Sequence, residues 1–262
     1  MGALHAGHIS LCKLSVEENN YTVASIFVNP RQFAAGEDLD SYPSTFDSDV
    51  MLLAEAGVDA VFCPDRKEVY GEGEGCTVEA VNFNDGLREG ISRPHFFGGV
   101  ATVVAKLFNI VAPTRAYFGQ KDAAQCVLVK RLVADLNFSI EIKIGDIVRE
   151  DNGLAMSSRN QYLSDADRVL CGIIYEGLRS GVDVYRSFQG GGDAVHSKEI
   201  IKAVEAVYRR EGSVISEILY ISVDNGDTMK AMEKVERNQP FIISSAVKVG
   251  AVRLIDNVTV NF

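Results

Sequence analysis

The sequence predicts an α/β protein, with a Rossmann-like doubly wound parallel sheet followed by a smaller α+β domain. Up to Glu150, short β-branched or aromatic runs alternate with segments of helical spacing, the pattern of βαβ units and a parallel sheet. After Glu150, two helical stretches precede a run of strands, which is typical of an α+β unit. A chain of 262 residues is long enough for two units, which we predict as domains of residues 1–149 and 150–262.

The first domain is expected to alternate helices and strands. Residues 7–20 carry apolar side chains at helical spacing, whereas residues 21–28 (YTVASIFV) form a nearly continuous apolar run that predicts a strand buried on both faces. Further helices are expected over residues 44–56, 99–113 and 121–137, and further strands over residues 58–63, 115–119 and 138–150. Gly57 and Pro113 end two of these helices.

The second domain follows a turn signal, Asp151-Asn152-Gly153, which we interpret as a hinge. Helices are expected over residues 164–188 and 196–211, and strands over residues 216–224, 240–249 and 251–260. Helices followed by consecutive strands predict a small α+β fold for this part of the chain.

Composition excludes several classes of protein. The net charge of −10 argues against a protein that coats nucleic acid or an anionic membrane. Every apolar run is shorter than the roughly 20 residues needed to span a bilayer, and MGALHAGH does not look like a secretory signal. The five cysteines are scattered without a CxxC pair, which predicts reduced, mostly buried thiols and a cytoplasmic protein.

Two histidines stand three residues apart in His5-Ala-Gly-His8, at the start of the first expected helix. Free N–H groups at a helix N-terminus can receive phosphate, and two imidazoles would add donors. The pair could instead be surface histidines or part of a metal site. A zinc site would need a third ligand, and the sequence has neither an HExxH motif nor a cysteine cluster.

Two further segments could bind phosphate. Lys121 lies at the expected start of a helix, where a cation opposes the helix dipole, so an anion nearby is a reasonable expectation; an exposed lysine that only aids solubility is the alternative. Met156-Ser-Ser-Arg-Asn160 offers two hydroxyls and a guanidinium that could clamp a polyphosphate, or it could be a turn followed by a helix cap.

Taken together and in this order, these segments resemble the pantoate–β-alanine ligase family, part of the nucleotidyltransferase superfamily with HIGH-type and KMSKS-type motifs. His5-Ala-Gly-His8 resembles the first motif and Met156-Ser-Ser-Arg159 a degenerate second one. The resemblance runs from Met1 to the C-terminus. Its other blocks are Val28-Asn-Pro-Arg-Gln-Phe33, Asp38-Leu-Asp-Ser-Tyr-Pro43, Ser92-Arg-Pro94, Gly99-Val-Ala-Thr-Val-Val104, Phe118-Gly-Gln-Lys-Asp122 and Arg253-Leu-Ile-Asp-Asn257.

The resemblance implies a two-step ligase that uses ATP and Mg2+. Pantoate would attack the α-phosphate of ATP to give pantoyl adenylate, and β-alanine would then displace AMP. The residues that would face the ATP phosphates are His5, His8, Lys121, Ser157, Ser158 and Arg159. The other residues implied at the site are Met1 and Gly119 for the adenosine pocket, Asp122 near the ribose, and Val148 and Met156 for ATP. Asn29, Gln32 and Gln125 are implied for pantoate, and Asp49 for Mg2+. The family also implies a homodimer, in which residues 1–149 form the domain that binds ATP and pantoate and residues 150–262 form a lid domain with the KMSKS-like loop.

The sequence departs from the family pattern in two places. In Arg93-Pro-His-Phe-Phe-Gly-Gly99 the histidine stands one place early, at His95, so that histidine's family role is not transferred. Family members also have a strand ending in Pro-Thr before the position of Met1. We therefore expect a truncated gene model, in which the strand over residues 21–28 has an unpaired edge and the chain is weakly stable, aggregation-prone and poorly active.

Two other functions remain open at this point. One is a different small-molecule nucleotidyltransferase, which would transfer a nucleotide and ignore β-alanine. The other is an inactive binding or scaffold protein, which would release no pyrophosphate. The amide pair Gln32 and Gln125 and the Ser-Ser-Arg-Asn loop favour the ligase.

Overall fold

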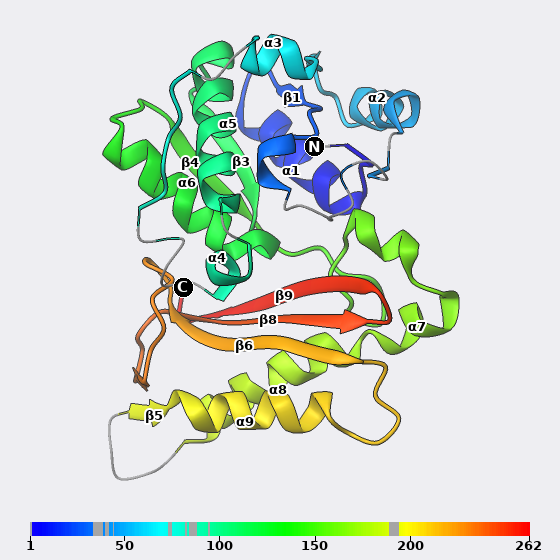
Figure 1. Cartoon of the computed structure of the whole chain (residues 1–262), viewed down its shortest axis with the longest axis vertical. Helices are drawn as coiled ribbons and strands as arrows, with labels where there is room; N and C mark the ends of the chain where they lie inside the picture. The colour runs from blue at the N-terminus through cyan, green and yellow to red at the C-terminus, as the bar shows by residue number, and fades with distance from the viewer. Residues whose placement is uncertain are drawn as a thin grey trace. The chain divides into compact units, whose positions relative to one another are not determined.

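A computed structural model describes residues 2–33, 39, 42–43, 45–72, 75–81, 83, 88–93, 95–188 and 194–262. The chain divides into two compact units, coloured by residue number in Figure 1. The first is Met1–Gln120 with Ala124–Asp146, and the second is Lys121–Ala123 with Ile147–Phe262. No local sequence pattern predicts that Lys121–Ala123 groups with the second unit. The binding roles that the sequence suggests for the two domains stay predictions.

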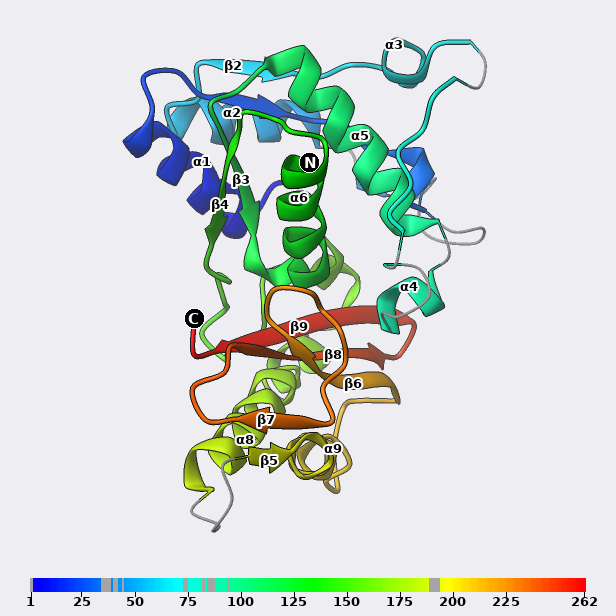
Figure 2. The ribbon, with the colours of Figure 1, turned by 90° about the vertical axis from the view of Figure 1, so that its left-hand side faces the viewer.

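Parallel strand pairs organise the first unit, which confirms the α/β class. Strand β1 (Val23–Ser25) pairs with β2 (Ala60–Phe62), and β3 (Arg115–Gly119) pairs with β4 (Glu141–Gly145). Figure 2 shows β3 and β4 side by side, in register from end to end. Within the described residues the two pairs are separate two-stranded sheets.

The helices of the first unit follow the apolar patterns of the sequence. They are α1 (Ala6–Glu18), α2 (Phe46–Glu55), α3 (Arg66–Tyr70), α4 (Arg88–Ser92), α5 (Phe96–Val111) and α6 (which runs Ala123–Asp135), with 3-10 turns η1 (Pro30–Gln32) and η2 (Gln120–Asp122). Gly57 ends the α2 segment with a φ of +82°, as its position after the last helical residue predicts. Ala112, in a left-handed conformation, and Pro113 end α5.

Strand β1 differs from its prediction because it has three residues rather than eight and is not buried on both faces. Tyr21 is 63% exposed and Val23 is 36% exposed. The physical reason is pairing: in the part of the chain that the structure describes, β1 has a neighbour on one edge only. The expected strand before Met1 and its consequences for stability stay predictions.

Helix α1 contacts both strand pairs of the first unit. Cys12 packs with Ala24 of β1, with Ile26 and with Leu53 of α2 in a small buried cluster. On another side of the helix, Leu11 lies so close to β4 that a Cβ on Gly145 would fall 2.4 Å from its side chain. A larger residue at position 145 would have to displace the end of the Leu11 side chain.

The second unit is the α+β fold that the sequence predicts. Strands β6 (Glu217–Asn225), β8 (Phe241–Val249) and β9 (Val252–Val260) form an antiparallel sheet, and β5 (Ala194–His196) pairs with β7 (Lys234–Glu236). The helices are α7 (Asp165–Leu170), α8 (Ile173–Ser187) and α9 (Ser197–Tyr208), with a 3-10 turn η3 (Ser158–Tyr162). Figure 1 shows α8 and α9 next to each other on one side of the sheet.

The core of this unit lies between the helix pair and the sheet. Tyr208 is fully buried there, and its hydroxyl donates to the carbonyl of Ile174 at 3.0 Å and hydrogen-bonds to Ser245 at 2.8 Å. Burial raises the pKa of the Tyr208 hydroxyl. Gly177 is required opposite its ring, because a Cβ at this position would fall 2.3 Å from Tyr208.

Two differences from the sequence prediction concern helix boundaries and cysteines. The single helix expected over residues 164–188 is two helices, because Nδ2 of Asn152 donates to the carbonyls of Arg168 and Val169, which would accept main-chain hydrogen bonds in a continuous helix. Of the five cysteines, none of which forms a disulfide, three are buried and two, Cys63 and Cys76, are exposed. Among the described residues, no helix is both long enough and apolar enough to cross a bilayer.

Candidate functional site

The two histidines begin helix α1 and hold each other in place. His5 is the N-cap, and its Nδ1 accepts a hydrogen bond from the Gly7 N–H at 3.2 Å, while Nδ1 of His8 accepts from the His5 N–H at 3.3 Å. Their ring centroids are 4.1 Å apart. Because both Nδ1 atoms accept, the neutral tautomer of each ring carries its proton on Nε2. Each imidazole therefore has a donor on the side away from the helix start.

Asp49 of α2 fixes the segment that leads into these histidines. Its carboxylate accepts from the main-chain N–H groups of Ala3 at 2.9 Å and Leu4 at 2.8 Å, and from the Thr45 hydroxyl at 3.0 Å. Asp49 is only 2% exposed. Ala3 has a left-handed backbone, with a φ of +49°, so the turn before His5 depends on these hydrogen bonds.

Asn29 organises the loop that carries Gln32. Its Nδ2 donates to the Gly99 carbonyl and to Oε1 of Gln32, both at 3.1 Å, and its Oδ1 accepts from the Tyr70 hydroxyl at 2.6 Å and from the Arg31 N–H at 3.2 Å. At 3% exposure this amide is enclosed by protein. Asn29 therefore shapes the loop, and of the two predicted pantoate contacts on this loop the half-buried Gln32 amide is the more accessible.

Three residues around this loop have no role assigned from the sequence, although Arg31 and Arg93 stand in blocks of the family resemblance. Tyr70 lies on the short helix α3, Arg31 stacks over its ring at 4.3 Å, and Arg93 donates to the Gln32 carbonyl at 3.0 Å. Burial raises the pKa of the Tyr70 hydroxyl, and the charge of Arg31 opposes that shift. Their partners are distant in sequence, so no local pattern indicates these contacts.

The loop with the displaced histidine packs against the same segment. Gly99 lies so near Arg31 that a Cβ would fall 2.3 Å from the Arg31 carbonyl oxygen, which explains a glycine there. His95 precedes α5 with a φ of +72°, and Arg93 stacks over the Phe96 ring at 4.1 Å. The position that carries histidine in the family pattern is thus used here for an arginine–aromatic contact.

The end of β3 and the start of α6 carry two more predicted residues. Gly119 is the last residue of β3, and its carbonyl accepts from the Cys126 thiol at 3.2 Å. Gln125 lies half-buried in the first turn of α6. These residues follow the carboxyl end of a parallel strand, where α/β proteins bind ligands.

Lys121 and Asp122 belong with the second unit. Asn257 of β9 donates from Nδ2 to the Lys121 carbonyl at 2.9 Å. The neighbouring Asp256 is 3% exposed and accepts two hydrogen bonds from Arg149, at 2.7 and 3.0 Å. The sequence placed Arg253-Leu-Ile-Asp-Asn257 among the family blocks, but it indicated no role for Asp256 or Asn257.

Val148 and Met156 face each other across a tight hairpin in the second unit. The Met156 N–H donates to the Val148 carbonyl at 2.9 Å. Arg149 and Ala155 pair in an isolated antiparallel β-bridge. The predicted hinge at Asp151-Asn152-Gly153 forms the turn of this hairpin. The backbone that leads to the serine pair is therefore held by cross-strand hydrogen bonds.

Ser157, Ser158 and Arg159 follow directly. Ser157 is the N-cap of η3, and its hydroxyl accepts from the Arg159 N–H at 3.3 Å. Asn160 is buried and donates to Glu150 at 2.9 Å and to the Ala155 carbonyl at 3.1 Å. Its Oδ1 has no hydrogen-bond partner in the described part of the chain. Three of the six predicted phosphate contacts, Ser157, Ser158 and Arg159, thus lie on one capped turn.

Glu150 connects this turn to helix α7. It accepts two hydrogen bonds from Arg168, at 2.8 and 2.9 Å. The Arg168 hydrogen bond lowers the pKa of Glu150, burial opposes that shift, and the Asn160 hydrogen bond lowers the pKa further. An ionised Glu150 is therefore part of the geometry of the serine–arginine turn.

The predicted residues thus form two groups, one in each unit. The first unit brings His5, His8 and Asp49 to one segment and Asn29 with Gln32 to one loop. In the second unit, Asn257 of β9 binds the Lys121 carbonyl, and the serine–arginine turn follows the hairpin. Met1 and parts of the family blocks at residues 38–43 and 92–94 lie outside the described residues. Within the described ranges, no three His, Cys, Asp or Glu side chains gather as a metal site, so these histidines have no such co-ligands there.

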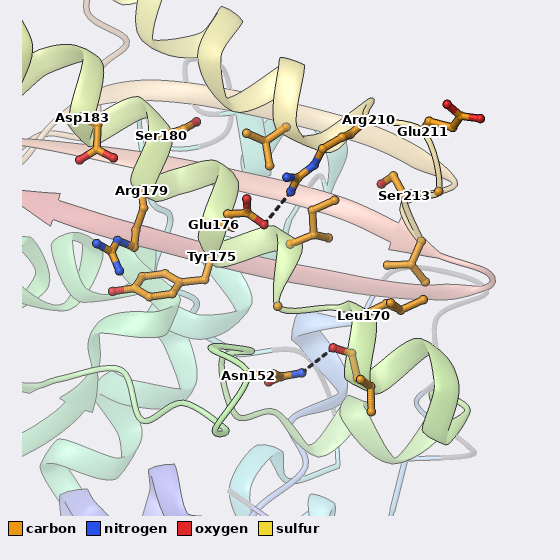
Figure 3. A pocket seen from close by; sticks show the side chains of 16 residues that line it. Asn152, Leu170, Tyr175, Glu176, Arg179, Ser180, Asp183, Arg210, Glu211 and Ser213 are labelled. Atoms are coloured by element: carbon orange, nitrogen blue, oxygen red, sulfur yellow. Dashed lines mark hydrogen bonds and ion pairs between the residues drawn. The ribbon is translucent and has the colours of Figure 1, made fainter.

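A separate pocket of about 770 Å3 lies on the second unit, at the start of α8 and the end of α9 (Figure 3). Its walls include Tyr175, Arg179 and an ion pair between Arg210 and Glu176, with N and O atoms 2.6 Å apart. The residues that line it include none of those predicted to contact ATP, pantoate or Mg2+.

Comparisons with known proteins agree with these motifs. Residues 1–259 match the family model described as pantoate-beta-alanine ligase. The chain is 44% identical over 260 residues to the pantothenate synthetase of Acetivibrio thermocellus, which covers 99% of this chain and 89% of that protein. It is 46% identical over 258 residues to that of Clostridium novyi, with coverages of 98% and 87%.

Solved structures are similar over the same extent. Pantothenate synthetase from Thermus thermophilus has a TM-score of 0.89 at 40% identity, covering 98% of this chain and 90% of that one. The pantoate-beta-alanine ligase of Francisella tularensis, solved with beta-gamma ATP and beta-alanine, has a TM-score of 0.75 at 33% identity, with coverages of 98% and 86%. With a family match over nearly its whole length, the chain belongs to the pantoate–β-alanine ligase family.

Proposed function

We propose that this chain is an ATP-dependent ligase that joins pantoate to β-alanine. The observation that carries the proposal is the family match over residues 1–259. In addition, the histidines predicted to bind phosphate lie at a helix start, and the predicted serine and arginine contacts lie at the start of a 3-10 turn. The test is a two-stage assay. Pyrophosphate release from ATP should require pantoate alone, and AMP release should follow when β-alanine is added. A different nucleotidyltransferase would ignore β-alanine, and a scaffold protein would release neither product.

The reaction passes through pantoyl adenylate. A pantoate carboxylate oxygen bonds to the α-phosphorus as the bond to pyrophosphate breaks. The amine of β-alanine then attacks the acyl carbon, loses a proton, and displaces AMP. No covalent nucleophile from the protein is needed, because the substrate carboxylate supplies it. The first step brings an anion to a polyanion, so the site must mainly supply positive charge and hydrogen-bond donors.

The donors for the phosphates come from two helix or turn starts and from Lys121. His5 and His8 present Nε2–H groups at the N-terminus of α1, where the helix dipole also favours an anion. Ser157, Ser158 and Arg159 supply hydroxyls and a guanidinium at the start of η3. The Lys121 ammonium adds the charge that suits the α-phosphate as its bond to pyrophosphate breaks.

The pantoate hydroxyls and carboxylate suit side-chain amides. Gln32 and Gln125 are half-buried amides and could contact pantoate directly. The nitrogen and the oxygen of the Asn29 amide already hydrogen-bond to protein groups, so we assign Asn29 to holding the loop in shape. We assign Met1, Gly119, Val148 and Met156 to the adenosine side of ATP, and Asp122 to the ribose.

Mg2+ enters this proposal together with ATP. Magnesium in such sites is held by one or two carboxylates plus the substrate phosphates. Asp49 offers a carboxylate whose oxygens already accept three hydrogen bonds, which leaves about one lone pair for a metal. The phosphates would therefore supply most of the ligands, and Asp49 at most one.

We further propose that the two parallel strand pairs belong to one Rossmann-like doubly wound sheet, with a strand position between β1 and β3. Support comes from α1, which packs against β1 through Cys12 and against β3 and β4 through Leu11. Main-chain amides on the edges of β1 and β3 that have no strand neighbour among the described residues should exchange quickly. Slow exchange along both edges would contradict this arrangement.

Homodimer formation and a cytoplasmic location complete the proposal. The dimer follows from the family resemblance, and light scattering coupled to gel filtration tests it. The location is supported by the five cysteines, which form no disulfide with one another and two of which are exposed, as suits a reducing compartment. Fractionation of cells that express the chain tests it.

A further inference from the structure

We infer that Asn257, held in place by the buried Arg149–Asp256 ion pair, is a positioning residue for Lys121. The inference rests on the proposed function, in which the Lys121 ammonium meets the phosphates of ATP. It assigns a role to three residues that pattern analysis of the sequence leaves without one.

The direct contact is made to the main chain of Lys121. Nδ2 of Asn257 donates to the Lys121 carbonyl at 2.9 Å, across 136 positions of sequence. Lys121 stands in η2, a 3-10 turn of three residues just before α6 begins at Ala123. So short a turn has little internal hydrogen bonding to fix its orientation. A side chain that binds its carbonyl therefore sets the direction in which the lysine leaves the backbone.

Asn257 itself is held on three sides. It lies on β9 opposite Ser244 of β8, and it is 2% exposed. Its main-chain N–H donates to Oδ1 of Asp256 at 2.8 Å, and its carbonyl accepts from Nη2 of Arg149 at 3.2 Å. A buried amide with these attachments is held in a single orientation.

The ion pair behind it is buried and geometrically specific. Arg149 meets Asp256 through both guanidinium Nη atoms, donates to the Gly153 carbonyl at 3.0 Å, and stacks over the Tyr175 ring at 3.7 Å. Burial raises the pKa of the Asp256 carboxyl, and the hydrogen bonds and charge of Arg149, with the charge of Lys121, oppose that shift. The Asp256 carboxyl therefore lies within electrostatic range of two cations, Arg149 and Lys121.

The same arginine also belongs to the hairpin that leads to the serine–arginine turn. Arg149 pairs with Ala155 in an antiparallel β-bridge, and the N–H of the next residue, Met156, donates to the Val148 carbonyl. Turn η3 packs against β9. Lys121 and Ser157–Arg159 are therefore attached to one framework, so the two phosphate-binding parts keep a fixed spacing. A displacement of about 1 Å in such a constellation can reduce a rate about 100-fold.

The test is a double-mutant cycle between Asn257 and Lys121. Two variants, Asn257→Ala and the isosteric Asn257→Asp, are each made in the wild-type chain and in Lys121→Ala. Asn257→Asp places an acceptor opposite the Lys121 carbonyl. Calorimetry gives ATP affinity, and pantoate-dependent pyrophosphate release gives the adenylation rate. We expect Asn257→Ala to lower the rate about 10-fold or more with an unchanged KM for pantoate, and to have no further effect once Lys121 is gone. Asn261→Ala, an exposed asparagine bonded to Tyr185 and Gln239, is the control and should change neither quantity.

The outcomes separate this inference from the proposed function. An equal loss in both backgrounds would mean a general structural role and would overturn the inference, as would an unchanged rate in Asn257→Ala. A wild-type chain that binds ATP but releases no pyrophosphate with pantoate would contradict the proposed function. In that case the coupling in ATP affinity still decides the inference: coupling supports it, and additivity overturns it.

Discussion

The carboxylate of Asp49 accepts a hydrogen bond from the main-chain N–H of Leu4 at 2.8 Å, immediately before the histidine pair. A second bond, from the Ala3 N–H, makes the carboxylate a clamp on the turn that precedes His5. The segment before α1 is thereby tied to α2, 45 positions away in sequence. The position of the imidazoles consequently depends on an acidic residue on another helix.

Replacing Asp49 tests this clamp. Asp49→Asn keeps the shape of the side chain but replaces one carboxylate oxygen with an NH2 group. That group would face one of the donors that Asp49 now accepts from, so a buried donor loses its acceptor. We expect a destabilisation of about 1–3 kcal/mol. Differential scanning calorimetry should show a fall in Tm of several degrees. A higher Mg2+ requirement for pyrophosphate release would support the metal role as well, whereas a lower Tm with an unchanged Mg2+ requirement would confine Asp49 to the clamp. An unchanged Tm would contradict the clamp itself.

His8 has both a structural and a proposed chemical part. His8→Ala removes an Nε2–H donor to the phosphates, and we expect adenylation to fall by roughly 100-fold. It also breaks the capping box with His5, which should reduce stability by about 1 kcal/mol. Ser10→Ala is a matched control, because it removes a hydrogen bond to the Gly7 carbonyl near the start of the same helix but leaves both imidazoles in place. Near-full adenylation in His8→Ala would rule out the phosphate contact.

Tyr70 should affect pantoate rather than ATP. Tyr70→Phe removes the 2.6 Å hydrogen bond to Asn29, whose Oδ1 then keeps only the Arg31 N–H. A loss of about 1 kcal/mol corresponds to roughly a fivefold increase in the KM for pantoate. Steady-state kinetics with each substrate varied in turn provides the measurement, and Tyr21→Phe at an exposed position is the control. A change confined to the KM for ATP would mean that this loop serves the nucleotide.

Local features could be predicted from the sequence because they depend on neighbouring residues. The strand over residues 115–119 has the predicted bounds, and Gly57 and Pro113 follow helices as their conformational preferences require. The histidine pair and the serine turn were recognisable because each is a contiguous motif. Their predicted contacts with ATP stay predictions.

What the sequence did not indicate depends on partners far along the chain. Arg149 and Asp256 are 107 positions apart, and Tyr70 and Asn29 are 41 apart. The break between α7 and α8 lies where the Asn152 side chain donates to the Arg168 and Val169 carbonyls, across 16 and 17 positions of sequence. Such contacts follow from packing, and a single sequence contains no periodic signal for them.

The last prediction concerns pH and the serine–arginine turn. Arg168 keeps the pKa of Glu150 below its ordinary value near 4.5, with burial opposing and Asn160 assisting. Because the folded-state pKa is the lower one, the ion pair stabilises fully above the unfolded-state pKa. Its contribution is lost as pH falls through the folded-state pKa. Arg168 is 45% exposed at its side chain, so solvent screening limits the contribution to below about 1 kcal/mol.

Glu150→Gln should therefore lower Tm slightly at pH 7 and make Tm fall less steeply between about pH 5 and pH 3, the range in which carboxyl groups titrate. It should also loosen the turn, because Asn160 loses a charged acceptor, so amides of residues 156–160 should exchange faster at pH 7. Glu176→Gln is the matched control, because Glu176 pairs with Arg210, which likewise lowers its pKa. Faster exchange in both variants would mean a general loss of stability, and unchanged exchange in Glu150→Gln would show that the turn is held without Glu150.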